Sequence, residues 1–295
     1  MNFAVIDVGG TFIKYACMNE NADIISRGKV PTPMTGRDDF IDTIVKIYHS
    51  MNDIKAVAIS LPGIIDVERG ICITSGNLKY NDGFNIVESL TNILHVPVTI
   101  ENDAKCEAYA EVKAGSLKDV SDSFVLIFGT GIGGTFIKDR KIHRGIHFSS
   151  GEISFIISDK DGSLIEADIF AQCSTRGLCQ MYANSLNVPF DSVNGEIFFK
   201  AVNAGDTLAI DCLDKITRRI AVQINNIQLI VDPERIAIGG GISAQPAFTE
   251  YIRCNLDKLY ESSEFNLPRA EVVTCKFLND SNLIGALYFC LDKLF

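Results

Sequence analysis

A glycine-containing hexapeptide that occurs twice constrains this chain more than any other feature of its sequence. The segments Gly9–Lys14 and Gly133–Lys138 are identical residue for residue. Each lies beside an apolar stretch typical of a buried strand, at Phe3–Val8 and at Phe124–Phe128. Recurrence of a motif at matching places indicates a duplicated structural unit, with chance recurrence as the alternative. We therefore expect two related halves, each containing a glycine hairpin.

Apolar periodicity extends this interpretation to the rest of both halves. The pattern predicts three strands, a helix, a strand, a helix, a strand and a helix in the first half, and a related order in the second. We expect domains at 1–118 and 119–295, with a closing helix at 281–295 that packs back on the first domain. The predicted strands are 3–8, 11–18, 24–30, 56–61, 96–100, 124–128, 135–138, 235–238 and 271–275, and the predicted helices are 38–51, 86–94, 103–114, 207–231, 246–259 and the closing helix.

Composition excludes several classes of protein. With 295 residues, 47% of them hydrophobic, the chain can bury a large core. No apolar run is long enough to cross a bilayer, and Asp7 interrupts the N-terminal apolar stretch, so we expect a cytoplasmic protein without a membrane partner. Nine scattered cysteines do not resemble a disulfide framework. A net charge of −10 without a basic cluster argues against a nucleic-acid partner.

The segment Gly129–Gly134 matches the dinucleotide-binding pattern G-x-G-x-x-G, but its context differs. That fingerprint requires a helix after the glycines, whereas Thr135–Lys141 alternates like a strand. The chain also lacks the P-loop pattern G-x-x-x-x-G-K-[ST]. The two hairpins favour a cleft ligand with several phosphates, because glycines let backbone N–H groups approach phosphate oxygens closely. Thr11 and Thr130 would add hydroxyl donors.

Residues near the hairpins suit a metal-bound nucleotide. Asp7 ends the first strand, where a carboxylate can hold Mg²⁺ through water, although an ordinary turn aspartate is the alternative. Lys14 can neutralise phosphate charge or be a solvated strand residue. Gly239–Gly241 follows a predicted strand and can admit a purine or ribose to the backbone, or simply form a tight turn.

The segment Glu101–Ala104 lies between a predicted strand and a predicted helix, which is a cleft-facing position in an α/β domain. Asn102 or Asp103 would serve there as a helix N-cap, and position alone favours that role. Beside two phosphate-binding hairpins, however, a carboxylate at the head of a helix also suits the base that accepts a hydroxyl proton in phosphoryl transfer.

These motifs resemble the ROK family (repressors, open reading frames, kinases), whose members have the two-domain actin-like ATPase fold. The resemblance covers nearly the whole chain, and the combination of motifs is highly specific. It implies an α/β fold with duplicated βββαβα(βα) halves flanking a cleft, and an ATP- and Mg²⁺-dependent sugar kinase. The matching segments are Asp7–Thr11, Leu61–Gly63, Glu101–Ala104, Gly129–Gly134, Gly151–Ile153 and Gly239–Gly241.

The resemblance also implies roles for individual residues. Asp103 would be the catalytic base. The sugar would be bound by Gly63, Asn77, Asn102, Asp103 and Glu152. The nucleotide would be bound at its phosphates by Gly9, Gly10, Thr11, Lys14, Gly129, Thr130, Gly131, Gly133 and Gly134, and at its adenosine by Gly239, Gly240 and Gly241.

Two departures from the family pattern concern zinc and the sugar. Most ROK kinases have a zinc-binding histidine where this chain has Phe155, followed by closely spaced cysteines of which only Cys173 and Cys179 remain. Two thiolates without a nitrogen partner cannot close a tetrahedral site, so we expect no structural zinc. Gln180 stands where the family usually has a sugar-contacting glutamate. The zinc-free pattern, with the segment Asp191–Glu196, is similar to the β-glucoside kinase branch.

The resemblance leaves several acceptors open: glucose, a β-glucoside such as cellobiose, and N-acetylmannosamine, with the 6-hydroxyl as the expected target. A sugar-sensing ROK transcription regulator is the main alternative, but it would carry a helix-turn-helix before the first hairpin, where only six residues precede Asp7. An actin-like ATPase without a sugar substrate would not require Asn102 and Asp103. Family analogy further implies a homodimer.

Overall fold

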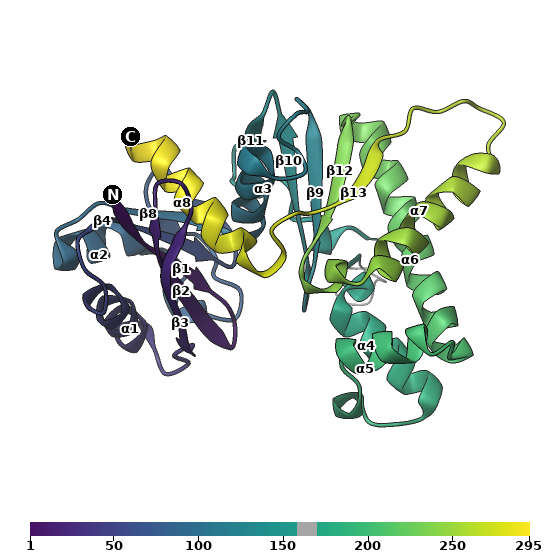
Figure 1. Cartoon of the computed structure of the whole chain (residues 1–295), viewed down its shortest axis with the longest axis horizontal. Helices are drawn as coiled ribbons and strands as arrows, with labels where there is room; N and C mark the ends of the chain where they lie inside the picture. Colours follow the sequence, from purple (N-terminus) through teal and green to yellow (C-terminus); the bar gives the residue numbers. More distant parts are fainter. Residues whose placement is uncertain (158–169) are drawn as a thin grey trace. The chain divides into compact units, whose positions relative to one another are not determined.

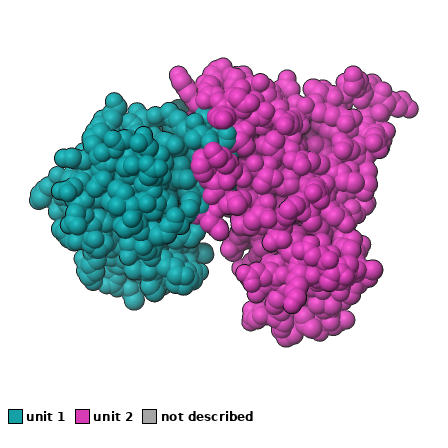
Figure 2. Space-filling view, in the orientation of Figure 1, with its two compact units in different colours: residues 1–115, 144–149, 280–295 teal, residues 116–143, 150–279 magenta. Residues whose placement is uncertain are grey.

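The structure, a computed structural model, describes residues 1–157 and 170–295 and divides the chain into two compact units (Figure 1 and Figure 2). Unit 1 consists of Met1–Gly115, Arg144–Ser149 and Asp280–Phe295. Unit 2 consists of Ser116–His143 and Ser150–Asn279. The chain therefore returns to unit 1 twice, once for the short segment 144–149 and once for its C-terminal helix.

Unit 1 is built on a five-stranded sheet in the order β3-β2-β1-β4-β8. β1 pairs antiparallel with β2 and parallel with β4, and β4 pairs parallel with β8. Residues 3–8 of β1 are all buried, as expected for a central strand covered on both faces. Because β1, β4 and β8 are parallel, their carboxyl ends meet at one edge of the sheet. The strands are β1 (Asn2–Val8), β2 (Phe12–Asn19), β3 (Ile24–Pro31), β4 (Ile54–Leu61) and β8 (Val98–Asn102), and a separate small sheet contains β5 (Ile65–Asp66), β6 (Ile71–Cys72) and β7 (Phe84–Asn85).

Four helices belong to unit 1: α1 (Arg37–His49), α2 (Ile86–Leu94), α3 (Asp103–Ala114) and α8 (Ser281–Leu294). α1 buries Phe40, Ile41, Ile44 and Ile47, whose spacing places them on one helical face. α1 contacts α2, while α8 packs along α3 and also contacts β1, β4 and β8 (Figure 1). The C-terminal helix is therefore part of the first unit.

Gly285 of α8 lies directly against α3. A Cβ at this position would come within 1.6 Å of the carbonyl oxygen of Cys106, a backbone atom that cannot move without shifting α3. Because overpacking a tight contact destabilises a fold, we expect Gly285→Ala to lower the free energy of unfolding by about 1–3 kcal/mol, measured by chemical denaturation. Gly195→Ala is the matched control, since its Cβ would only touch Thr175 Cγ2 at 3.6 Å. Equal losses in both variants would contradict the packing argument.

Unit 2 has a second five-stranded sheet, in the order β11-β10-β9-β12-β13. β9 pairs antiparallel with β10 and parallel with β12, and β12 pairs parallel with β13. The long helix α6 packs against α7, α4 and α5 (Figure 1). The strands are β9 (Ser123–Phe128), β10 (Ile132–Lys138), β11 (Lys141–His143), β12 (Arg235–Gly239) and β13 (Glu271–Thr274), and the helices are α4 (Thr175–Leu186), α5 (Gly195–Asn203), α6 (Thr207–Val231) and α7 (Pro246–Glu261).

The two sheets have the same strand order and directions, which confirms the predicted duplicated α/β fold. The repeated hexapeptide, however, does not occupy equivalent positions. In unit 1 the turn closes at the pair Val8 and Ile13, whereas in unit 2 it closes at Phe128 and Ile132. The turn of unit 2 is therefore residues 129–131, and Gly133 and Gly134 lie inside β10. Our interpretation of the two hexapeptides as matching hairpin positions was wrong, because register follows the strand pairing and not the local identity.

The sequence pattern also missed the helices α4 and α5, the strand β11 and the three two-residue strands β5, β6 and β7. Among residues 1–157 and 170–295, no helix combines the length and apolarity needed to cross a bilayer. The functional division into a sugar-and-phosphate domain at 1–118 and a nucleotide domain at 119–295 stays a prediction.

Candidate functional site

The carboxyl edge of the first sheet gathers four of the predicted site residues of unit 1. Asp7 of β1 is in register with Ser60 of β4, and Leu61 of β4 with Asn102 of β8. Gly63 follows two residues after β4, and Asp103 begins α3 directly after β8. Parallel pairing therefore brings Asp7, Gly63, Asn102 and Asp103 to one edge of the sheet.

Asp7 is 7% exposed and is surrounded by polar side chains. Its Oδ1 accepts hydrogen bonds from Ser60 Oγ and Asn282 Nδ2, both at 3.1 Å, and its Oδ2 lies 4.0 Å from Lys14 Nζ. Burial raises the pKa of the Asp7 carboxyl, while Lys14 and the two hydrogen bonds act in the opposite direction. A carboxylate oxygen beside a lysine suits a hydrated divalent cation paired with phosphate. Sequence reasoning missed Ser60 and Asn282, which carry no motif.

The first glycine turn has room for a ligand. A Cβ at Gly10 would meet no atom within 4 Å, and Gly10 and Thr11 are exposed. The N–H group of Gly9 is already bonded to Phe12 O at 3.1 Å, so Gly9 shapes the turn. Lys14 follows in β2 with a side chain that is 49% exposed. These features fit a phosphate group held by the backbone and a flexible ammonium.

Asn102, and not Asp103, caps α3. Asn102 Oδ1 accepts from the N–H of Lys105 at 3.1 Å, which is the N-cap bond. Asn102 Nδ2 donates to Gly63 O at 2.8 Å and to Asp103 Oδ1 at 3.0 Å. Asp103 Oδ1 also accepts from Ala104 N at 2.8 Å. The carboxylate of Asp103 is thus oriented by its neighbours but is not needed as the cap, so the competing structural role suggested by its position falls to Asn102.

The two predicted turn residues of unit 1 differ in how tightly they are held. Gly63 has a φ of +97°, and a Cβ there would lie 2.2 Å from Thr74 O, so only glycine fits. Asn77 is exposed and lies in the loop after β6. Two residues earlier, the N–H and the hydroxyl of Ser75 donate to Asp82 Oδ1 at 2.9 and 2.6 Å. Gly63 is therefore a fixed point beside Asn102, while Asn77 presents an accessible amide.

Unit 2 gathers its predicted residues at the ends of β9 and β12. The N–H of Gly129 bonds to Gly131 O at 2.9 Å and closes the turn after β9. Gly240 has a φ of +81°, and a Cβ there would lie 2.3 Å from Phe128 O, so the backbone of Gly240 packs directly against the residue before Gly129. Gly129, Gly131 and Gly241 each face open space where a Cβ would stand. The sequence motifs at 129–131 and 239–241 therefore meet within one unit.

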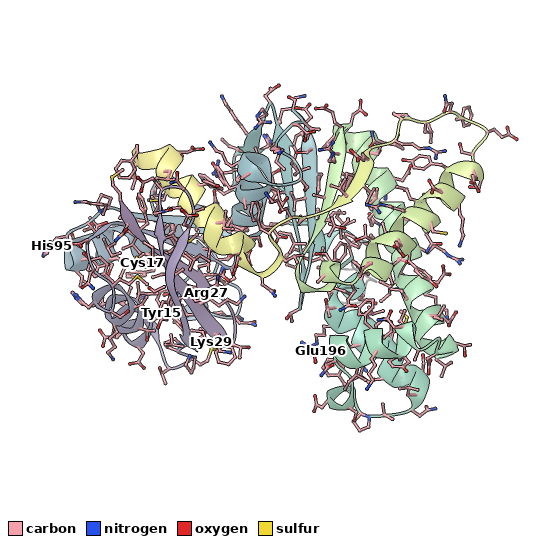
Figure 3. All side chains as sticks on the ribbon, in the orientation of Figure 1. Tyr15, Cys17, Arg27, Lys29, His95 and Glu196 are labelled. Carbon is pink, nitrogen blue, oxygen red and sulfur yellow. The ribbon has the colours of Figure 1, made fainter. Side chains whose placement is uncertain are left out.

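A cavity of about 860 Å³ opens beside these glycines, within the range usual for small-molecule sites. Gly129, Thr130 and Gly241, three of the residues predicted to bind the nucleotide, line this cavity, and their nucleotide-binding role stays a prediction. Sequence reasoning missed the lining residues that α4 and α5 supply; Figure 3 labels Glu196, the second residue of α5. Ile242 of η5 (Gly241–Ala244) lines the cavity as well. Ser174 and Asn194 cap α4 and α5, and these caps were the available signal. The added lining residues are Phe128, Thr175, Arg176, Cys179, Phe190, Val193, Asn194, Gly195, Glu196, Phe199, Ile242 and Gln245.

Gly241 allows a direct test of this cavity as the nucleotide site. A Cβ at Gly241 meets nothing within 4 Å, so Gly241→Val should fold normally and occupy part of the cavity. We expect the KM for ATP to rise by about 10- to 200-fold, since crowding of a fitted pocket costs a few kcal/mol, and the KM for the sugar to stay unchanged. Steady-state kinetics with each substrate varied in turn gives both values. An unchanged KM for ATP would place the nucleotide elsewhere.

The remaining predicted residues of unit 2 have other surroundings. Gly133 and Gly134 are strand residues, and a Cβ at Gly134 would lie within 3.0 Å of Gly151 O and Ile153. Gly134 therefore packs against the segment carrying Glu152, which is half-buried at the start of η2 (Ile153–Phe155). Phosphate binding by Gly133 and Gly134 stays a prediction. Phe155 is 62% exposed.

Cys173 and Cys179 are both buried, and Gln180 Nε2 donates to Asn184 Oδ1 at 2.8 Å. Burial raises the pKa of the Cys179 thiol, which disfavours the thiolate that a metal requires. Within the described ranges, which omit 158–169, no three histidine, cysteine or acidic side chains are grouped to hold a metal ion. The expectation of no structural zinc stays a prediction.

Comparison with known proteins adds independent information. Residues 3–293 match the profile of the ROK family. A β-glucoside kinase of Klebsiella pneumoniae is 28% identical over 290 residues, which cover 98% of this chain and 95% of that protein. An N-acetyl-D-glucosamine kinase of Photobacterium profundum is 31% identical over 80% of this chain and 83% of that protein. The crystal structure of a ROK family protein of Streptococcus pneumoniae in complex with sucrose has a TM-score of 0.89 to this chain, with 26% identity and 99% of each chain covered.

Proposed function

This chain belongs to the ROK family, and we propose that it transfers the γ-phosphoryl group of ATP to a sugar hydroxyl, with Asp103 as the base that accepts the hydroxyl proton. The carbohydrate kinase activity predicted from the sequence is confirmed by relatives that carry kinase names and match along most of their length. The observation that carries the choice of Asp103 is that Asn102 caps α3 and also donates from its Nδ2 to Asp103 Oδ1, which orients this carboxylate at the carboxyl edge of the first sheet.

Phosphoryl transfer passes through a loose transition state, so the protein mainly positions the reactants and balances charge. A sugar hydroxyl is too weak an acid to ionise first. Asp103 would accept its proton as the bond from oxygen to phosphorus forms. The hydrogen bonds from Asn102 Nδ2 and Ala104 N fix Asp103 Oδ1, so the carboxylate does not need to reorganise during the reaction.

The nucleotide would be bound through backbone and charge. Gly10, Thr11, Thr130 and Gly131 would donate to phosphates, Gly9 and Gly129 would shape the turns, and Lys14 would add a cation. Asp7 would hold Mg²⁺ through water, and Mg²⁺ when bound neutralises charge on the phosphates. Gly239–Gly241 and the cavity beside them would bind the adenosine.

The sugar would be bound by Gly63, Asn77, Asn102, Asp103 and Glu152, with the 6-hydroxyl as the expected acceptor. The relatives named as a β-glucoside kinase and an N-acetyl-D-glucosamine kinase support a hexose derivative as the substrate. Phe155 and Gln180 replace residues that in the family usually belong to the zinc and sugar shell. We favour a β-glucoside, because the β-glucoside kinase matches over nearly its full length.

A coupled assay of ADP release against a panel of sugars tests this function. The panel contains cellobiose, a simple β-glucoside, glucose, N-acetylglucosamine and N-acetylmannosamine, and each sugar is compared with a reaction without sugar. Sugar-dependent release, largest for a β-glucoside, is the expected result. Release that no sugar accelerates would reject the kinase proposal.

The expectations of a homodimer and of a cytoplasmic location stay predictions. Light scattering on the purified protein measures the first: a mass of twice 32.3 kDa is expected.

A further inference from the structure

Glu101, the residue before Asn102, has no solvent exposure and is fully engaged in hydrogen bonds. Its Oε1 accepts from the N–H of Asn102 at 2.8 Å. Its Oε2 accepts from Arg144 Nε at 3.1 Å and also from Arg144 Nη2. A buried carboxylate needs such a partner, because leaving one charge of a buried pair alone is strongly unfavourable.

Arg144 is held just as closely. Its Nη2 also donates to Tyr109 Oη at 3.1 Å, and its guanidinium lies over the rings of Tyr109 and Phe289 at 5.8 and 5.5 Å. Burial alone would lower the pKa of Arg144, but Glu101 and Tyr109 raise it above its ordinary value, so the arginine stays charged. The strand β8 and the helices α3 and α8 thus surround one arginine that comes from another part of the chain.

That arginine is the first residue of the segment 144–149, which belongs to unit 1 although residues 116–143 and 150–279 belong to unit 2. Its ion pair therefore anchors this segment to the strand end that carries the base. A continuous series of contacts follows from Arg144 to Glu101, to the N–H of Asn102, and from the Asn102 amide to Asp103 and Gly63.

We propose that Arg144 is a positioning residue for sugar phosphorylation, which acts through Glu101 and Asn102 on the orientation of Asp103. This inference rests on the proposed function. Asn102 both caps α3 and orients the carboxylate of Asp103, so a shift of its backbone displaces the base and the sugar-binding amide together. Displacement by about 1 Å can cost 100-fold in rate, so the effect of losing Arg144 falls on the sugar reaction.

The test compares Arg144→Met with wild type and with Arg235→Met. Arg235 is a matched control because its side chain is 18% exposed, against 20% for Arg144, and because it too forms ion pairs with carboxylates. Its partners are Asp119 and Glu271, both in unit 2. We expect Arg144→Met to lower kcat/KM for the sugar by about 10- to 100-fold. The KM for ATP should be unchanged, and Arg235→Met should leave both parameters unchanged.

The outcomes separate the two proposals. A wild-type protein that phosphorylates no sugar rejects the proposed function and this inference with it. An active wild type with unchanged sugar kinetics in Arg144→Met, or with an equal rise in the KM for ATP, overturns the positioning role alone. If Arg144→Met does not fold, as judged by circular dichroism, Arg144→Lys decides by the same criteria, since lysine keeps the charge but cannot make both bonds of the guanidinium.

Discussion

Replacing Asp103 with asparagine is expected to lower kcat for sugar phosphorylation by about 10²- to 10⁴-fold, the usual contribution of a general base. The amide has nearly the shape of the carboxylate, so it can still accept the hydrogen bonds from Asn102 Nδ2 and Ala104 N. The sugar and ATP should therefore still bind, which calorimetric titration measures directly. The loss should appear in kcat, because a proton acceptor acts in the transition state and not in the ground state.

Asp206 provides a matched control for this experiment. It is an N-cap aspartate, whose side chain accepts from Ala209 N at 2.9 Å at the start of α6. Asparagine caps helices as well as aspartate does, so Asp206→Asn should retain both stability and kcat. A kcat for Asp103→Asn equal to that of Asp206→Asn would show that Asp103 is also only structural.

Asp7→Asn is expected to have the second largest effect, a fall in kcat of about 10²- to 10³-fold, since losing part of the metal's charge stabilisation removes a few kcal/mol from the transition state. The same change should not destabilise the ligand-free protein at pH 7. Burial raises the pKa of Asp7, which means that folding disfavours its charged form, and a neutral amide removes that cost while still accepting from Ser60 and Asn282.

Steady-state kinetics measures the fall in kcat, and denaturant unfolding measures the free energy of unfolding of the ligand-free protein. Lys29→Met on β3 is a control for charge near the first hairpin, because Lys29 is paired in register with Lys14 and its ammonium lies over the ring of Phe12 at 5.0 Å. It should retain kcat. If Asp7→Asn kept wild-type kcat, or lost activity only through unfolding, Asp7 would have no part in the chemistry.

The five strands of the main sheet and the helices of unit 1 were predictable because their apolar residues repeat at clear periods, whereas the two-residue strands β5, β6 and β7 are too short to show one. α2 was predicted at its exact bounds, since Asn85 caps it and His95 ends it in a left-handed conformation. The helices α4 and α5 were missed. Length does not explain this, because α4 and α5 have 12 and 9 residues, as α3 and α2 do. The caps at Ser174 and Asn194 and the buried apolar residues at helical spacing were signals that the sequence interpretation did not use.

The candidate site was predictable where residues follow strands directly. Asp7, Asn102 and Asp103 needed only the rule that parallel strands share one carboxyl edge. The roles within Asn102–Asp103 were not predictable, since either side chain suits a helix cap and only coordinates show which one makes the bond. Side-chain partners that are distant in sequence could not be predicted either. Asn282 donates to Asp7 and Arg144 pairs with Glu101, and no local sequence pattern indicates these contacts.

The literal repeat of Gly9–Lys14 pointed to the correct architecture for an incomplete reason. The duplication lies in the order and direction of the strands, whereas the two copies of the hexapeptide begin at different points of their hairpins. Sequence identity within a strand does not fix its register, because pairing with the neighbouring strand does.

The most direct measurement is mass spectrometry of the products formed from ATP and a β-glucoside, with ADP quantified in the same reaction. The account predicts a sugar heavier by one phosphoryl group, in an amount equal to the ADP formed, and almost none of either product with Asp103→Asn. ADP formed at the same rate with and without the sugar, with no phosphorylated sugar detected, would contradict it.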